Sequence, residues 1–162
     1  MKDSVKIITK SDRDTKRAGK LFAKTVQSAG KRSRALVISL EGDLGSGKTT
    51  FTKGFAEGLG IKDMIQSPTF VILKIYQRNT FKRSRKSVAS HNLFKNLIHI
   101  DAHRIFQKDL KVLGWKEFIK NPHNILLVEW GERLKKSLPK DAIHIKFFHE
   151  KSLHIRRIQF EQ

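Results

Sequence analysis

The sequence predicts an α/β fold: a three-layer sandwich whose central sheet is mostly parallel, with antiparallel strands at its C-terminal end. Strand and helix patterns alternate along the chain, which is typical of parallel sheets covered by helices. Residues 35–40 and 125–129 form short, continuously apolar runs, as strands buried on both faces do. The alternating segments 142–148 and 153–160 are separated by a polar turn, and we expect them to form an antiparallel pair.

The other elements follow from local patterns. Residues 5–9 alternate and are β-branched, which predicts a strand. Polar residues 11–14 can cap a helix that runs to about residue 28 with apolar side chains at helical spacing. Gly60 suits the end of a helix that begins near Lys48. Further along the chain we expect strands at 71–76 and 97–101, a helix at 108–120 and a short helix around 132–137.

Length and composition limit the class of protein. A chain of 162 residues predicts one domain, 1–162, and 38% hydrophobic residues are enough for one modest core. The absence of cysteine excludes disulfides, thiolate-zinc sites and cysteine nucleophiles. No apolar run approaches the roughly 18 to 20 residues of a membrane span, and the polar N-terminal segment does not resemble a signal peptide. We therefore expect a cytoplasmic protein without a membrane partner.

The chain is strongly basic. Its 34 Lys and Arg residues against 15 Asp and Glu residues give a formal net charge of +19, which favours a polyanionic or acidic partner. A generally lysine-rich composition would explain the same charge. Part of it lies in a basic insertion at about 77–96, and no acid occurs between Asp63 and Asp101.

A phosphate-binding loop follows the apolar run 35–40 and precedes a predicted helix. Residues 42–49 match G-x-x-x-x-G-K-[ST] in full, in the strand–loop–helix context that this motif requires. Glycines let backbone N–H groups curl around phosphate oxygens, Lys48 can reach the β- and γ-phosphates, and the Thr49 hydroxyl can bind Mg²⁺. The sequence therefore predicts a P-loop NTPase-like fold. The residues expected to bind the nucleotide here are Asp43, Leu44, Gly45, Ser46, Gly47, Lys48, Thr49 and Thr50.

Two predicted strands end in carboxylates, at Asp101 and at Glu129. Parallel strands would bring both acids near the phosphate loop, where such acids hold Mg²⁺ or position the attacking water. His99, Asp101 and His103 lie two residues apart, so on a strand they would share one face and could also hold a transition metal. The usual guanine-recognition motif, [NT]-K-x-D, does not occur after the loop, which favours ATP over GTP.

Five motifs stand in a specific order: GDLGSGKTT (42–50), SPTF (67–70), HIDAHR (99–104), LGWKEF (113–118) and EWGERL (129–134). This order resembles the TsaE (YjeE) family, the ATPase of bacterial tRNA threonylcarbamoyladenosine biosynthesis, from about residue 36 to residue 134. The resemblance implies TsaD and TsaB as partners. In that system TsaD transfers a threonylcarbamoyl group to adenosine 37 of tRNAs reading ANN codons, and the resemblance implies that ATP hydrolysis by this protein would reset the complex between cycles.

The resemblance also implies roles for single residues. Lys48 and Thr49 would keep their roles on phosphate and Mg²⁺, and Thr69 would act as a switch residue near the γ-phosphate. Asp101 would help to hold Mg²⁺, directly or through water. Glu129 would lie at the metal or orient water. Trp130 would lie beside the nucleotide or be a core aromatic, and Arg104 would contact phosphate or a partner or form a surface ion pair.

The sequence departs from the family in two places. His103 stands where the family usually has Tyr, and the insertion at 77–96 is longer and more basic than the usual link. The insertion could contact tRNA or an acidic face of a partner, or be a solvated loop.

Two other functions remain open from the sequence. A small-molecule kinase could use the same loop, with the basic stretch 78–86 as a lid. An RNA-binding protein could use ATP as a regulator, although few aromatic residues lie among the basic ones.

Overall fold

The computed structural model describes residues 4–30, 32–66, 72–78, 94–150, 152 and 154–161. Its strands are β1 (Ser4–Thr9), β2 (Leu36–Glu41), β3 (Leu73–Gln77), β4 (Asn96–Asp101), β5 (Asn124–Glu129), β6 (Ile143–His149) and β7 (Arg156–Glu161). The α-helices are α1 (Asp12–Ser28), α2 (Lys48–Gly58) and α3 (Trp115–Lys120), and the short 3₁₀ helices are η2 (Ala102–Arg104), η3 (Gln107–Leu110) and η4 (Gly131–Leu134).

The strands form one sheet in the order β1-β7-β6-β2-β5-β4-β3. Its centre, β6-β2-β5-β4, is parallel, whereas β7 pairs antiparallel with both β6 and β1, and β3 pairs antiparallel with β4. The α/β fold class is confirmed, and so is the antiparallel pair near the C-terminus. The apolar runs of β2 and β5 lie side by side in the middle, where both faces of a sheet are covered.

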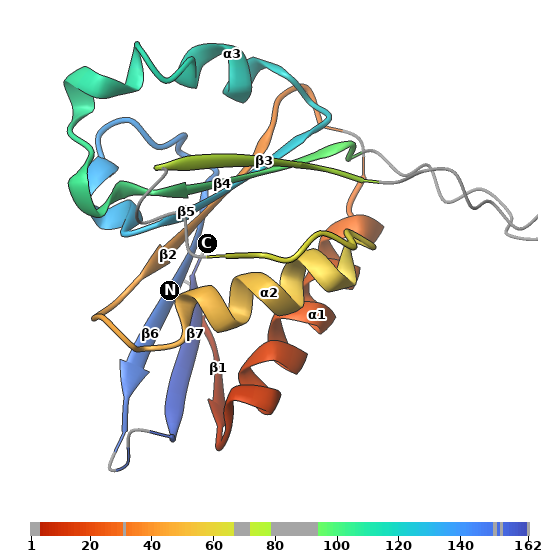
Figure 1. The fold of residues 1–162 in the computed structure, drawn as a ribbon, viewed down its shortest axis with the longest axis vertical. Helices are drawn as coiled ribbons and strands as arrows, with labels where there is room; N and C mark the ends of the chain where they lie inside the picture. Colours follow the sequence, from red (N-terminus) through yellow and green to blue (C-terminus); the bar gives the residue numbers. More distant parts are fainter. Residues whose placement is uncertain are drawn as a thin grey trace, which may run out of the picture.

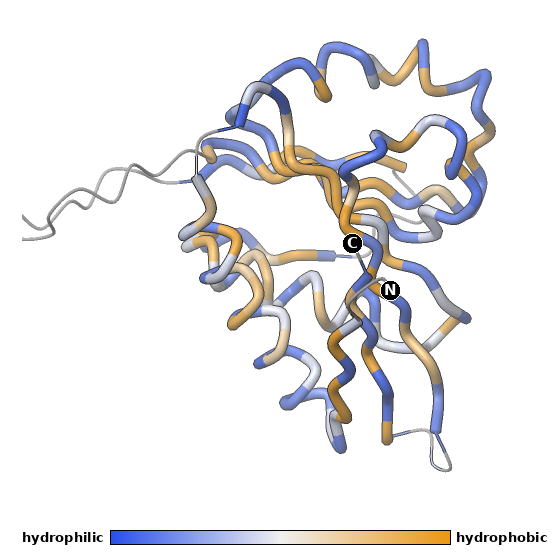
Figure 2. Tube along the Cα trace, turned by 180° about the vertical axis from the view of Figure 1, so that it is seen from behind, coloured by the Kyte–Doolittle hydropathy of each residue, from blue (hydrophilic) through white to orange (hydrophobic). Residues whose placement is uncertain are grey.

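Helices cover both faces of the sheet (Figure 1). Helices α1 and α2 lie on one face, and the segment that contains α3 lies on the other. Alternate residues of β2 show the two cores: Ile38 and Leu40 pack with the Phe51 side of α2, and Val37 packs with the Trp115 side of α3. Figure 2 shows the apolar residues concentrated along the central strands between these layers.

The N-terminal helix begins as its sequence predicts. The Ser11 hydroxyl caps α1 by accepting a hydrogen bond from the backbone N–H of Asp14, with a distance of 3.1 Å between Oγ and N. Among the residues that the structure describes, no helix is long and apolar enough to cross a membrane.

Three predicted elements differ from the structure. The single helix expected at 108–120 is wrong, because Gly114 adopts φ +73° and separates η3 from α3. The short helix expected around 132–137 is the 3₁₀ helix η4. The strand expected at 71–76 begins at Leu73, after Ile72 with φ +69°. Helical spacing of apolar residues does not reveal such local left-handed positions.

Helices α1 and α2 approach each other closely through glycines. A Cβ atom added at Gly54 of α2 would lie 1.8 Å from the carbonyl oxygen of Lys16 in α1, whereas one added at Gly30 would meet nothing within 4 Å. We therefore predict that Gly54→Ala lowers the free energy of unfolding by about 3 kcal/mol, because the helices must separate. Urea unfolding of this variant beside the control Gly30→Ala measures the difference, and equal midpoints for both variants would contradict the close packing.

Candidate nucleotide-binding site

The phosphate loop joins the end of β2 to the start of α2, as the sequence predicts. At two positions of the loop, both the backbone conformation and the lack of space for a side chain require glycine. Gly42 has φ +133°, and a Cβ there would lie 2.3 Å from the carbonyl oxygen of Phe147. Gly47 has φ +101°, and a Cβ there would lie 2.9 Å from Cδ of Arg156. A side chain at either position would force the loop away from the strands that support it.

Lys48 is buried at the start of α2 and points back into the loop. Its ammonium group donates to the carbonyl oxygens of Gly42 and Asp43, at 2.6 and 2.8 Å from Nζ. It also lies 4.1 Å from the centre of the Trp130 ring, a cation–π distance. Burial lowers the pKa of Lys48, and nearby carboxylates, Glu129 first, oppose that shift. Phosphate oxygens could take the places of the two carbonyl groups.

The two predicted acids lie side by side at the same edge of the sheet. Strands β4 and β5 are parallel neighbours, and Asp101 is directly opposite Glu129 in their register. Glu129 is in turn opposite Leu40, the residue before the end of β2, and the phosphate loop begins where β2 ends. Both acids are buried, with 4% and 3% of their surface exposed. The expectation that parallel strands bring both acids to the loop is confirmed.

Glu129 contacts the loop directly. The Thr49 hydroxyl donates to its carboxylate, with Oγ1 at 3.0 Å from Oε1 and 3.1 Å from Oε2. On the other side, Nε2 of the fully buried His99 lies 2.8 Å from Oε1 of Glu129. The carboxylate is therefore fixed between a residue of the loop and a residue of β4.

Asp101 has a different environment. Its Oδ1 accepts a hydrogen bond from the backbone N–H of His103 at 2.8 Å, which caps the 3₁₀ helix η2. His103 thus lies beyond the strand, and its ring packs 5.1 Å from the Trp130 ring. His99, Asp101 and His103 therefore do not share one face, and the alternative of a transition-metal site on that face is wrong. In the part of the chain that the structure describes, no group of three or more His, Cys, Asp or Glu residues could hold a metal ion.

Trp130 closes the site beside Lys48. It has φ +60°, and its backbone N–H donates to the carbonyl oxygen of Leu40 at 2.9 Å, which ties the end of β5 to β2. Its ring contacts both the Lys48 ammonium and the His103 ring. At position 103, this chain therefore places a histidine ring against Trp130.

A small cavity of about 160 Å³ joins these groups. Its lining residues are Leu44, Gly45, Ser46, Gly47, Lys48, Thr49, Thr50, Asp101, Glu129 and Trp130. Asp43 takes part through its carbonyl oxygen, whereas Thr69, the SPTF motif and residues 79–93 of the insertion lie outside the described residues. The Ser46 hydroxyl is buried without a hydrogen-bond partner among the residues that the structure describes. The loop, an ammonium group, a hydroxyl group and two carboxylates fit the chemistry of a phosphate with Mg²⁺.

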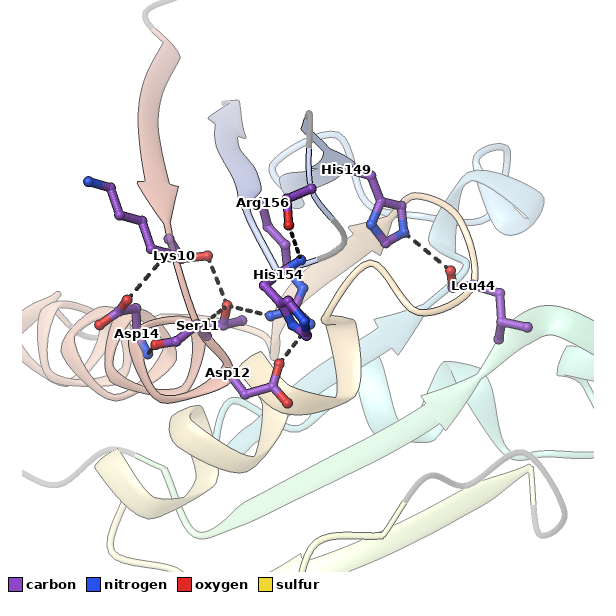
Figure 3. A network of polar contacts seen from close by, with 11 residues as sticks. Lys10, Ser11, Asp12, Asp14, Leu44, His149, His154 and Arg156 are labelled. Atoms are coloured by element: carbon purple, nitrogen blue, oxygen red, sulfur yellow. Dashed lines mark hydrogen bonds and ion pairs between the residues drawn. The ribbon is translucent and has the colours of Figure 1, made fainter.

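Two residues that support the loop could not be predicted from the sequence pattern. Arg156 of β7 packs against Gly47 and reaches the start of α1, where its Nη2 lies 2.6 Å from Oδ1 of Asp12 (Figure 3). His149, at the end of β6, places Nε2 3.4 Å from the carbonyl oxygen of Leu44. These residues lie more than one hundred positions from the loop along the chain, and no local signal connects them to it.

Known proteins resemble this chain over most of its length. The profile of the family described as threonylcarbamoyl adenosine biosynthesis protein TsaE matches residues 9–158. The tRNA threonylcarbamoyladenosine biosynthesis protein TsaE of Bacillus subtilis (strain 168) is 39% identical over 109 residues, which cover 67% of this chain and 59% of that protein. The protein of the same name from Treponema pallidum (strain Nichols) is 30% identical over 142 residues, 87% of this chain and 89% of that protein.

A solved structure resembles the whole fold. The crystal structure of Bacillus subtilis YdiB superposes with a TM-score of 0.69 at 31% identity, covering 99% of this chain and 86% of that chain. The chain thus spans less than two thirds of the Bacillus subtilis sequence relative and most of the Treponema pallidum relative. Since the family profile matches nearly all of the residues between β1 and β7, this chain belongs to the TsaE family.

Proposed function

We propose that this protein is a Mg²⁺-dependent ATPase that supports TsaD and TsaB in the threonylcarbamoyl modification of adenosine 37 in tRNA. The observation that carries the proposal is the direct contact between Thr49 of the phosphate loop and Glu129, beside the buried Lys48. The names of the relatives, which refer to tRNA threonylcarbamoyladenosine biosynthesis, supply the pathway.

The loop would hold the triphosphate. Lys48 would exchange the carbonyl oxygens of Gly42 and Asp43 for phosphate oxygens, and it would do so without moving far, because its ammonium group already lies inside the loop. The N-terminus of α2 adds the positive end of an eleven-residue helix. Trp130, which packs on Lys48, would limit the access of water to that ammonium group.

Thr49 and Glu129 would hold Mg²⁺ together with the phosphates. A hydroxyl group and one carboxylate are typical of Mg²⁺ sites that share the ion with a nucleotide. Bound there, the ion would neutralise charge that develops on the phosphates. Asp101, next to Glu129 and in the same cavity, would orient the attacking water. The contact between Glu129 and Thr49 supports the place given to Glu129 at the ion.

His99 would keep Glu129 in position. We predict that His99→Ala lowers magnesium-dependent ATP hydrolysis by about 10- to 100-fold, because the carboxylate loses the partner that fixes its orientation. His99→Gln, whose amide can still donate, should retain more of the activity. The measurement is a magnesium titration of the hydrolysis rate. If both variants depended on magnesium as the wild type does, His99 would be a core residue without a role at the metal.

A reconstituted modification reaction tests the proposed function. With TsaD, TsaB, tRNA, a donor of the threonylcarbamoyl group and ATP, we expect this protein to increase the number of modification cycles but not the yield of the first. Lys48→Ala should remove that increase. Equal multiple-turnover yields with and without this protein would contradict the proposal.

A contact between tRNA and the basic insertion also stays a prediction, and deleting the insertion in the same assay would measure its contribution.

A further inference from the structure

A groove of about 520 Å³ lies beside the nucleotide site, on the surface of the two segments that follow the two acids. One wall is Ile105–Gln107, which comes directly after η2 and hence after Asp101. The other wall comes from η4 and the residues after it, which follow Glu129 and Trp130. Both walls therefore begin within four residues of a residue that lines the nucleotide cavity, Asp101 on one side and Trp130 on the other.

The surface of the groove combines an exposed aromatic ring with positive charge. Phe106 is 58% exposed, and the Arg133 guanidinium and the Lys108 ammonium lie 5.9 and 6.0 Å from the centre of its ring. Lys135 and Lys136 also line the groove. Exposed aromatic residues beside arginine are typical of the residues that dominate protein–protein binding energies.

The groove is connected to the nucleotide site through Trp130, whose ring lies 4.1 Å from the Lys48 ammonium and which directly precedes η4. Of the described residues that line the groove, Glu132 is the one acid. Burial raises the pKa of Glu132, and its own backbone N–H and the Lys48 ammonium oppose that shift. Because Trp130 packs on Lys48 and leads into η4, a change in the position of Lys48 on binding of a nucleotide would reach this wall of the groove.

We propose that this groove binds an acidic protein segment that carries an apolar side chain, and that the partner detects the bound nucleotide there. The apolar side chain would lie on Phe106, and the acids would pair with Arg133 and the lysines of the rim. RNA fits less well, because Phe106 is the one aromatic residue among the described residues that line the groove, whereas single-stranded RNA stacks successive bases on several aromatic side chains. The inference rests on the proposed function, since it names the surface by which the TsaD–TsaB pair would bind.

Binding of the TsaD–TsaB pair to immobilised full-length protein, with ATP and Mg²⁺, tests the proposal. We expect Phe106→Ala and Arg133→Glu each to weaken binding by about tenfold or more. The matched controls are Val112→Ala, an apolar side chain that is 90% exposed but does not line the groove, and Lys24→Glu on α1, on the opposite face of the sheet. Both controls should bind as the wild type does, and all four variants should keep the ATP affinity of the wild type.

The outcomes separate the two claims. If the wild type does not bind the pair, the proposed function fails, and the inference fails with it. If the wild type binds and the Phe106 and Arg133 variants bind equally well, the inference alone is overturned. Variants that bind the pair normally but lose binding of tRNA, with a steep dependence on salt, would overturn it in favour of an RNA surface.

Discussion

Lys48→Ala is expected to abolish magnesium-dependent ATP hydrolysis, with a loss of about 10²- to 10³-fold. The side chain is buried, its ammonium group lies inside the loop, and alanine would leave the carbonyl oxygens of Gly42 and Asp43 without the donor that now satisfies them. The measurement is the hydrolysis rate at saturating ATP, together with ATP affinity by calorimetry.

A second lysine on the same helix provides the control for this prediction. Lys53 is exposed on α2 and does not line the nucleotide cavity, so Lys53→Ala should retain the wild-type rate. If Lys48→Ala also hydrolysed ATP at the wild-type rate, the loop would not be the site of the reaction.

Glu129→Gln is expected to lower hydrolysis by about 10²- to 10³-fold and to weaken the binding of Mg²⁺. The amide keeps the shape of the side chain and can still accept from Thr49, so the fold should be retained, but the negative charge beside the hydroxyl is lost. Magnesium titrations of ATP hydrolysis measure the effect. Asp101→Asn provides the comparison, since it should slow hydrolysis with little change in magnesium affinity.

Comparing these two variants shows which acid binds Mg²⁺ and which orients the water. A magnesium affinity that falls in Asp101→Asn and not in Glu129→Gln would reverse the roles proposed here. Full activity in both variants would contradict a role for either acid.

The parts of the site that could be predicted from the sequence are local or follow from topology. The loop at 42–49 has a complete motif between a strand and a helix, and both features appear in the structure. Asp101 and Glu129 end apolar runs, and parallel pairing alone brings such ends together. These residues could be assigned because the physical reason for each lies within a few positions of it.

The remaining parts depend on contacts between distant segments. Arg156 supports Gly47 from the last strand, far away in the sequence. The contact of His99 with Glu129 depends on the pairing of β4 with β5, and the alternating pattern of His99, Asp101 and His103 does not reveal it. Gly114 breaks a helix whose apolar spacing is otherwise continuous. The groove at Phe106 could not be found either, because its two walls are formed by segments that meet only in the folded chain.

The rate of ATP hydrolysis, measured with and without TsaD and TsaB, tests the central claim most directly. The protein should hydrolyse ATP slowly alone, and the rate should change when TsaD and TsaB are added. Lys48→Ala should not hydrolyse ATP with or without the pair. A Lys48-dependent rate that is indifferent to the pair would contradict the role proposed for this protein in tRNA modification, and it would favour a phosphate loop that serves another reaction.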